Sequence, residues 1–564
     1  MAFQLSPGVS VSEVDNTNVV PSTLTTAGAF AGTFTWGPVN KVSLVDNEIT
    51  LRRLFGKPSS NTSYTSGTSF FTAANFLSYG NNLSVVRAVP TTANNAVAQG
   101  TPVQVQNETV FEASYLNNDN ANAFGPWMAR YPGALGNSIT VSICDNATTY
   151  TSWTYKNLFS SAPGTSTFAS QVGGSSDEMH IVVLDAQGKF TGTSNTVLET
   201  YSFVSKARDA QQNGDSNYYK QKIYSDSKYI YAVDPADYSN TNSTWGSTAS
   251  GVAFATLVTN ITTPLTGGLG GDPTDANLVT AYNLFNNKET TDISLIITGD
   301  ASITVQQACI DLAATRQDCI AFISPPKSAV VNQTEASALT NIQNWLTSLG
   351  RSSTYAVADS GWKYEFDQYN NVYRWIPLNA DVAGLCVFTD YVRDPWFSPA
   401  GFNRGAIRNA IKLAWNPSKT YRDTLYSAGI NPVVSFPGQG IVLFGDKTLT
   451  SRPSAFDRIN VRRLFIVLEK AIGKASQSSL FEQNDEFTRS QFISTVSPFL
   501  REIQGRQGIV DFRIVCDATN NTQQVIDSNQ FVGDIYIKPT RSINFIQLNF
   551  IAVGSGVEFT TVTG

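Results

Sequence analysis

TDISLIITGDASITVQQACIDLAATRQDCIAFISPP (291–326) contains two apolar runs on either side of a segment of helix length. The runs cover 291–300 and 318–326, and the segment between them covers 301–317. Short apolar runs separated by segments of this length are typical of parallel strands joined by crossover helices. The stretch therefore predicts a strand–helix–strand unit of a doubly wound parallel sheet.

The alternation continues downstream of this stretch. Residues 332–350 predict a helix that ends at Gly350, and residues 353–361 predict another strand. The sheet is therefore expected to gain at least one more parallel strand.

The same alternation occurs near the N-terminus. Residues 39–58 predict a short strand and then a helix that ends at Gly56, and residues 69–89 predict a helix followed by a buried strand. We expect both stretches to belong to one layer, which makes the α/β domain discontinuous, with segments 24–90 and 266–379.

Between these segments, residues 91–265 predict a β-rich insertion that points outward. The composition shifts toward Asn, Ala, Gln and Thr, and turn residues recur between short apolar stretches. The predicted strands are TPVQVQNETVFEASY (101–115), NSITVSICD (137–145), MHIVVLD (179–185), TVLETYSFV (196–204) and SKYIYAV (227–233). The Gly-rich LTGGLGGDPTD (265–275) closes the insertion.

After the α/β layer, residues 380–540 predict an α+β domain. Residues 430–449 predict a hairpin, 459–475 an amphipathic helix, and 484–504 a second helix with Asn484 as its N-cap. Three strands are predicted to follow, at 508–517, 530–539 and 542–553.

Both ends of the chain, 1–23 and 541–564, predict strand-like arms. In FQLSPGVSVSEVD (3–15), Val9 and Val11 share one face, but no hairpin partner follows. At the other end, one face carries Ile546, Leu548 and Phe550. A lone terminal strand exposes unpaired N–H and C=O groups, so each arm needs a partner elsewhere.

The composition favours a folded protein with extensive protein–protein contacts. The 564 residues are 41% hydrophobic and 11% aromatic, but only 15% are charged. The net charge of −6 argues against nucleic acid and anionic membrane as direct partners, since both attract basic patches. Five sparse cysteines indicate reduced thiols, and neither a signal peptide nor an apolar run of 18 residues is evident. We expect a soluble protein that folds in the cytoplasm.

The chain offers little for catalysis. His180 is the only histidine, so it is predicted to be a surface or half-buried strand residue. The glycines of Gly267–Gly271 are not followed at once by a helix, as a dinucleotide-binding loop requires, and predict a hinge or turn. In 117–125, Ala121 and Ala123 occupy positions where a calcium loop needs ligands. We therefore predict no catalytic, cofactor-binding or metal-binding residue, and no enzyme.

Four basic residues lie on the helix predicted at 459–475, beside its apolar stripe. They are Arg462, Arg463, Lys470 and Lys474. Two interpretations remain open: a solvated surface, or a face that docks on an acidic protein surface.

Seven stretches carry a family resemblance. They are LSPGVSVSEVD (5–15), WGPVNKVSLVDNEITLRRLFGKP (36–58), ARYPGALGNSITVSI (129–143), WFSPAGFNRGAI (396–407), LYSAGINPVVSFPGQGIVLFGDKTL (425–449), INVRRLFIVLEKAI (459–472) and FEQNDEFTR (481–489). Together they resemble the contractile tail sheath proteins of myovirus-type bacteriophages, in family order across most of the chain. Ser43 departs from the pattern, in which proline is common, and the insertion matches poorly.

The resemblance implies a helical homo-oligomer of stacked, hexameric rings around an inner tail tube. The sheath is attached to a baseplate, and its contraction drives the inner tail tube through the bacterial envelope for genome delivery. The implied partners are other copies of the chain, the tail tube protein, and the baseplate and tail terminator proteins; the implied location is the virion tail.

The resemblance also implies that the terminal arms insert as extra strands into the sheets of neighbouring subunits. Val9 and Val11 at one end, and the face at 546–550 at the other, would anchor them. We further expect the C-terminal domain to lie innermost, with its basic helix facing the tube or adjacent subunits.

Three alternatives remain open. The first is the sheath of a phage-like contractile injection particle or secretion system. The second is an enzyme on the 291–361 layer, against which the lack of a phosphate loop argues. The third is a glycan-binding appendage, suggested by the aromatic, Asn-rich insertion.

Overall fold

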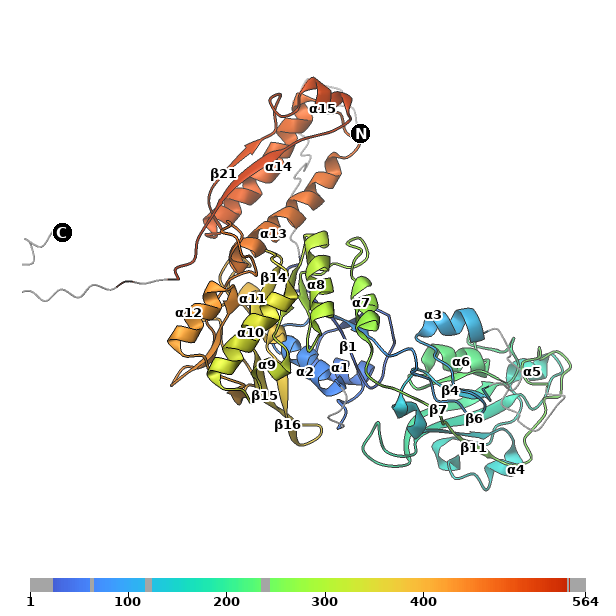
Figure 1. Ribbon diagram of the computed structural model, residues 1–564. Coiled ribbons are helices and arrows are strands. Elements are labelled where there is room, and N and C mark those ends of the chain that lie inside the picture. Colours follow the sequence, from blue (N-terminus) through green and yellow to red (C-terminus); the bar gives the residue numbers. More distant parts are fainter. Residues whose placement is uncertain (1–23, 61–64, 117–123, 235–243, 545–546, 548–564) are drawn as a thin grey trace, which may run out of the picture. The chain divides into compact units, whose positions relative to one another are not determined.

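The computed structural model describes residues 24–60, 65–116, 124–234, 244–544 and 547. The chain forms two compact units (Figure 1). Unit 1 comprises Trp396–Ser398 and the described part of Arg463–Gly564, and unit 2 comprises the described parts of Thr23–Pro395 and Pro399–Arg462. The limits given above for the arms, the insertion and the C-terminal domain remain predictions.

A seven-stranded sheet forms the centre of unit 2, in the order β18-β14-β13-β12-β1-β3-β2. Its strands are β1 (Gly28–Gly32), β2 (Ser43–Val45), β3 (Leu83–Arg87), β12 (Leu295–Ile297), β13 (Ile320–Ile323), β14 (Ala356–Asp359) and β18 (Ile430–Asn431). All neighbours pair in parallel except β2, which is antiparallel to β3. The sheet confirms the prediction that the stretches near residues 40–90 and 290–360 share one layer. Strand β1 was not predicted.

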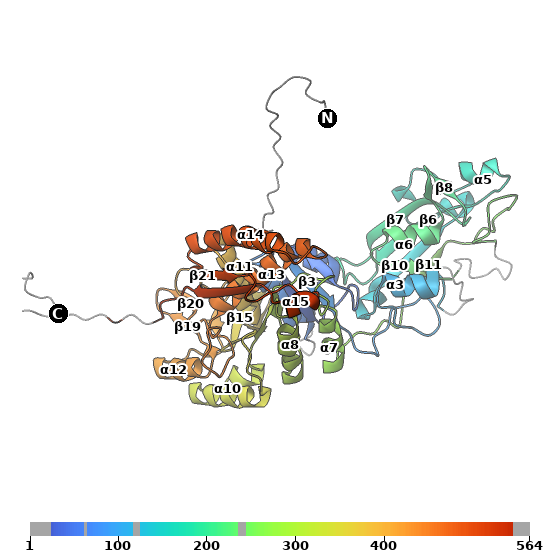
Figure 2. The same cartoon turned by 90° about the horizontal axis from the view of Figure 1, so that it is seen from above.

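Helices cover both faces of this sheet, as a doubly wound fold requires (Figures 1 and 2). They are α1 (Glu48–Phe55), α2 (Ser66–Leu77), α7 (Asp275–Asn283), α8 (Ile303–Arg316), α9 (Lys327–Val330), α10 (Glu335–Leu349), α11 (Asn379–Val392) and α12 (Lys419–Ser427). Alternate residues of β1 show the two faces: Ala29 packs in a core with Tyr282 of α7, whereas Gly28 lies against Phe76 of α2. The predicted end of α10 is confirmed, because Gly350 is its left-handed C-cap.

The inserted segment has an antiparallel sheet of its own, in the order β11-β5-β6-β7, and two separate pairs, β10-β4 and β8-β9. The elements are β4 (Trp127–Ala129), β5 (Ile139–Cys144), β6 (Glu178–Asp185), β7 (Thr196–Ser205), β8 (Gln211–Gln212), β9 (Asp215–Ser216), β10 (Ile230–Ala232), β11 (Ile261–Pro264), α3 (Glu108–Phe111), α4 (Ala147–Tyr150), α5 (Thr167–Gln171) and α6 (Tyr219–Asp226). The strand predicted at 101–115 is wrong. Asn107 caps α3 there, and a π-helix continues it over Glu112–Leu116.

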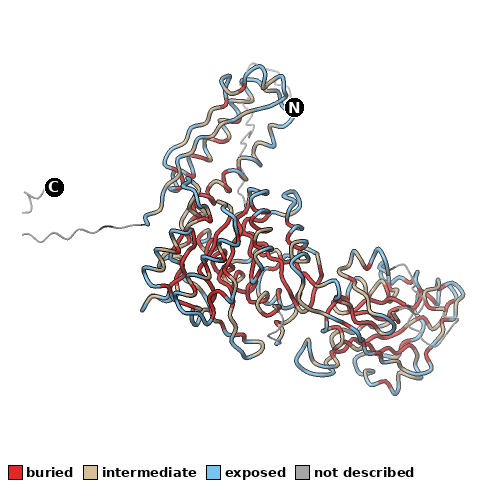
Figure 3. The backbone as a smooth tube through the Cα atoms, in the orientation of Figure 1, coloured by how far each residue is buried: buried red, intermediate tan, exposed pale blue. Residues whose placement is uncertain are grey.

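Two further small sheets complete unit 2. One, β16-β15-β17, contains β15 (Trp362–Asp367), β16 (Val372–Pro377) and β17 (Lys412–Leu413). The other is the hairpin of β19 (Val433–Phe436) and β20 (Gly440–Leu443), which confirms the hairpin predicted at 430–449. Buried residues run through most strands of the unit (Figure 3).

Unit 1 packs two long helices against a two-stranded sheet. Its elements are α13 (Ile459–Ser476), which begins in unit 2, α14 (Glu486–Gly505), α15 (Gln523–Asp527), β21 (Ile509–Val515) and β22 (Asp534–Pro539). Leu464, Val496 and Ile509 are buried in its core. The N-cap predicted for α14 is wrong by one residue: Asp485, not Asn484, accepts a hydrogen bond from the Thr488 N–H. None of the described helices has both the length and the hydrophobicity that crossing a membrane requires.

Candidate functional site

The carboxyl ends of the parallel strands are the place where open α/β sheets usually bind ligands. Here Ser324, which follows β13, donates its hydroxyl to the carboxylate of Asp359, the last residue of β14, at 2.6 Å. Asn379 at the start of α11 donates both to Ser324 Oγ and to the Gly299 carbonyl. These side chains are buried. The polar groups at this edge of the sheet therefore bond one another and fasten α11.

Burial raises the pKa of Asp359 to about 8, although the Ser324 hydroxyl and the Gly361 N–H both stabilise its charge. The folded state thus holds a proton up to about pH 8 that the unfolded chain releases near pH 4, so stability falls as the pH rises through this window. Asp359→Asn cannot ionise; its Oδ1 can still accept the Gly361 N–H, and its Nδ2, in place of Oδ2, can donate to Ser324 Oγ. Urea unfolding at pH 4, 6 and 8 should show that the free energy of unfolding of the variant, relative to that of the wild type, rises by more than about 1 kcal/mol from pH 4 to pH 8. A difference that does not change with pH would contradict this assignment.

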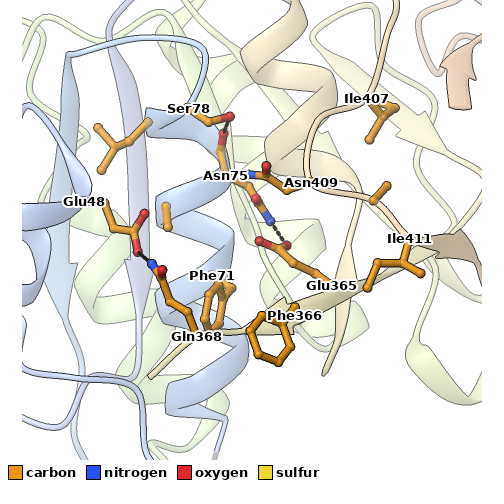
Figure 4. A pocket seen from close by; sticks show the side chains of 13 residues that line it. Glu48, Phe71, Asn75, Ser78, Glu365, Phe366, Gln368, Ile407, Asn409 and Ile411 are labelled. Atoms are coloured by element: carbon orange, nitrogen blue, oxygen red, sulfur yellow. Dashed lines mark hydrogen bonds between the residues drawn. The ribbon is translucent and has the colours of Figure 1, made fainter. Parts of the chain in front are cut away.

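A cavity of about 640 Å³ lies between α2 and the strand β15, and Figure 4 shows its polar side chains. Glu48 accepts hydrogen bonds from Gln368 and from the Tyr369 hydroxyl. Glu365 accepts one from Asn75 at 2.7 Å, and burial raises its pKa to about 7. The two carboxylates thus tie α1 and α2 to the β15–β16 hairpin.

In the described part of the chain, no group of three or more His, Cys, Asp or Glu side chains is arranged to hold a metal ion. His180 is buried in β6, where Nδ1 accepts the Phe203 N–H and the ring stacks on Phe159 at 4.1 Å. Burial lowers its pKa. His180 is thus a strand residue, as the sequence predicted, but it is buried rather than half-buried or at the surface.

The four basic residues predicted on α13 fall into two pairs. The guanidinium carbon of Arg462 lies 3.9 Å from the centre of the Phe456 ring and 4.2 Å from that of Tyr355. Arg462 and Arg463 are only 5% and 4% exposed. Lys470 is half-buried and Lys474 is exposed. Only the second pair therefore presents charge on the surface of the described chain.

Unit 1 contains an open groove of about 1140 Å³. One wall is the helix α13, with Phe465, Leu468 and Ile472, and another is strand β22, with Ile535 and Ile537. Among the described residues, β22 pairs with β21 and with no other strand, so its second edge is unpaired. Within the described part of the chain, the groove thus has apolar walls, one of which is a strand that pairs on one edge only.

The predicted anchors for this kind of site, Val9 and Val11 together with Ile546, Leu548 and Phe550, lie outside the described residues. Sequence reasoning predicts the arms, which stay a prediction, but it missed the groove. The residues that line the groove come from α13, α14, β22 and their connections, and no local pattern brings them together.

Two sequence families match the C-terminal half of the chain: the phage tail sheath protein central domain at residues 271–449 and the phage tail sheath C-terminal domain at 451–552. The tail sheath protein of Vibrio phage KVP40 is 34% identical, over 99% of this chain and 100% of that relative. The chain belongs to the phage tail sheath protein family. The tail sheath protein of Enterobacteria phage T4 is 32% identical, over 99% of both chains.

Solved structures show that this sheath protein shares its fold with sheath tail proteins from bacterial genomes. That of Desulfitobacterium hafniense has a TM-score of 0.53 at 11% identity and covers 91% of this chain and 94% of that chain. That of Listeria innocua has a TM-score of 0.52 at 12% identity, with the same coverage.

The predicted family is therefore confirmed, and the chain is a subunit of a contractile tail sheath. The curated relatives that match it over its whole length are phage proteins, so the sheath of an injection particle or secretion system is not favoured.

Proposed function

We propose that this sheath protein polymerises into a helical tube of stacked rings around the inner tail tube. It contracts by rigid-body rearrangement of subunits, which drives the tail tube through the bacterial envelope. Its partners are other copies of the chain, the tail tube protein, and the baseplate and tail terminator proteins. It folds in the host cytoplasm, becomes part of the virion tail, and works without enzymatic chemistry, cofactor or metal.

The observation that carries this proposal is the groove beside strand β22. As far as the chain is described, the sheet next to α13 and α14 has two strands, and apolar side chains of β22 line the groove. A strand from a neighbouring subunit would supply the missing backbone partners and would cover Ile535 and Ile537. Subunits joined in this way stay connected while they rotate and slide.

The terminal arms are the strands that we propose for this exchange. The backbone hydrogen bonds that an added strand gains are largely offset by the entropy lost when a dozen residues become ordered. The net free energy of strand exchange must therefore come from the burial of apolar side chains. Val9 and Val11 would anchor the N-terminal arm, and Ile546, Leu548 and Phe550 the C-terminal arm. We also propose that unit 1 lies innermost and that Lys470 and Lys474 of α13 face the tube or a neighbour.

Replacing Val9 and Val11 together with Asp tests the exchange. The purified wild-type chain should form tubes in negative-stain micrographs, whereas the double variant should remain a folded monomer. Two carboxylates cannot enter an apolar groove without partners, so we expect a loss of polymerisation of at least about a hundredfold. Gel filtration and circular dichroism check that the monomer is folded.

The matched control is Ser10→Asp with Ser12→Asp, which adds the same charge to the opposite face of the arm. It should still form tubes. Normal tubes from the Val9 and Val11 variant would refute the N-terminal anchor, and a wild-type chain that makes no tubes would refute self-assembly.

A further inference from the structure

Unit 1 exposes an apolar tip between α13 and α14, here defined as residues 480–487. Leu480 is 62% exposed, Phe481 is fully exposed and Phe487 is 75% exposed. Phe481 also has a φ of 70°, a left-handed conformation that is costly for a residue other than glycine. The fold thus holds a phenyl ring in water on a strained backbone, and this is typical of a contact residue awaiting a partner.

The tip is also acidic. Glu482, Asp485 and Glu486 are exposed around the two phenylalanines. Asp485 caps α14, and its hydrogen bonds from Thr488 lower its pKa. The only basic residue on the first turn of α14, Arg489, donates to Asn484. A partner for this tip should therefore combine an aromatic surface with a positive charge.

Unit 2 has such a surface, here called the aromatic platform. Phe402, Phe436 and Phe444 form a triangle of rings whose centres lie 5.1 to 5.9 Å apart. Phe402 and Phe444 are 52% and 42% exposed. The guanidinium carbon of Arg422 lies 5.5 Å from the Phe436 ring centre and 6.0 Å from that of Phe444.

The charge of Arg422 is available to a partner. Its guanidinium donates to the Pro417 carbonyl at 3.2 Å, and it forms no ion pair with a carboxylate among the described residues. The loops beside the rings leave room for a partner, because a Cβ added at Gly401, Gly438 or Gly440 would meet nothing within 4 Å. The platform is therefore an open aromatic surface with one uncompensated cation.

We propose that the tip of one copy docks on the aromatic platform of a second copy, with Phe481 on the three rings and the carboxylate of Glu482 against Arg422. The tip and the platform both carry exposed aromatic side chains, and their charges are opposite. Because this chain supplies both complementary surfaces, a second copy is favoured over another protein. Tip and platform are different surfaces, so the contact is head-to-tail, and such contacts propagate into helical assemblies. The inference rests on the proposed self-assembly and adds a second contact, made by tip residues that also line one part of the groove: Leu480, Phe481 and Glu482.

A charge exchange tests the ion pair. Glu482→Arg and Arg422→Glu should each raise the concentration needed for tube formation by about tenfold or more, and the double variant should restore it. Wild-type tubes with unchanged single variants would overturn the docking proposal and leave the proposed function intact. A wild type without tubes would overturn the function itself.

Disulfide formation tests whether the contact joins two copies. All five native cysteines are buried, so introduced thiols react without competition at the surface. Phe481→Cys and Phe402→Cys are purified separately, mixed, assembled and oxidised. We expect a cross-linked dimer in the mixture and none with either variant alone. Tyr373→Cys, at an aromatic that is 54% exposed elsewhere in unit 2, is the matched control for Phe402→Cys. A mixture that stays monomeric, or that cross-links equally well with Tyr373→Cys, would overturn the proposal.

Discussion

Lys206→Met should destabilise the inserted β-rich segment by about 3–5 kcal/mol, because it leaves a buried carboxylate without its cation. Lys206 Nζ lies 2.8 Å from Asp145 Oδ2, and both side chains are 0% exposed. The ammonium also donates to the carbonyls of Ser176 and Ala255. Methionine fills a similar volume but supplies none of these three donors. Thermal unfolding and limited proteolysis of the purified chain would measure the loss.

The surface pair of Lys222 and Asp226 supplies the control for this prediction. Its side chains are 41% and 46% exposed, and the pair links successive turns of α6. Lys222→Met should cost no more than about 0.5 kcal/mol. A second comparison removes both buried charges, with Lys206→Met and Asp145→Leu together, and should recover part of the stability. Equal losses for Lys206→Met and Lys222→Met would contradict the role given to the buried pair.

Local pattern was sufficient to predict the strands β12, β13 and β14 of the α/β layer and the helices α8 and α10. Helix α10 begins at a Thr334 cap and ends at Gly350, and both signals stand in the sequence next to a strand on either side. The order and spacing of such strands and helices along the chain are enough to predict a parallel sheet. The antiparallel strands β5, β6 and β7 were also predicted from local pattern, because each carries apolar residues at short intervals over the length of a strand.

The central strand β1 could not be predicted in the same way. Its sequence, GAFAG, contains only one large side chain and two glycines. The small residues are required by the packing: a Cβ at Gly28 would lie 2.6 Å from the Phe76 ring, and one at Gly32 would lie 2.7 Å from the Phe30 ring. The residues of a strand between two parallel neighbours thus depend on the side chains that pack on the two faces of the sheet. Those side chains are distant in the sequence.

The surfaces that we propose for assembly could be predicted from the sequence only where one segment carries them. The arms show their alternation locally, and the predicted family is confirmed. The aromatic platform joins residues 402, 422, 436 and 444, and no spacing in the sequence links them. The burial of Arg462 also depends on Tyr355, which is more than a hundred residues away. Amphipathic periodicity identifies the basic arc of α13 but does not show which of its charges are covered.

Arg87 at the end of β3 holds three segments of unit 2 together through carbonyl groups alone. Its guanidinium donates to the Phe34 carbonyl at 3.0 Å and to those of Gly37 and Pro132 at 2.7 Å. The side chain is 1% exposed and has no carboxylate partner within the described part of the chain. Burial lowers its pKa to about 9, which still leaves it charged at neutral pH. The fold tolerates this buried cation because planar donors satisfy three oxygens at once.

Arg87→Met should therefore destabilise unit 2 by roughly 3–6 kcal/mol, since each buried carbonyl that loses its donor costs about 1–3 kcal/mol. The stability of Arg87→Lys should lie between that of the wild type and that of Arg87→Met, because a single ammonium cannot reach three carbonyls with the geometry of a guanidinium. The control is Arg351→Met, which breaks an ion pair with Asp311 whose side chains are 40% and 55% exposed and should change stability by less than about 1 kcal/mol. Urea unfolding compares the three variants, and protease cleavage near residue 132 reports whether the Pro132 segment loosens first. If Arg87→Met were no more costly than Arg351→Met, the three carbonyls would have found other donors, and Arg87 would not be what joins these segments.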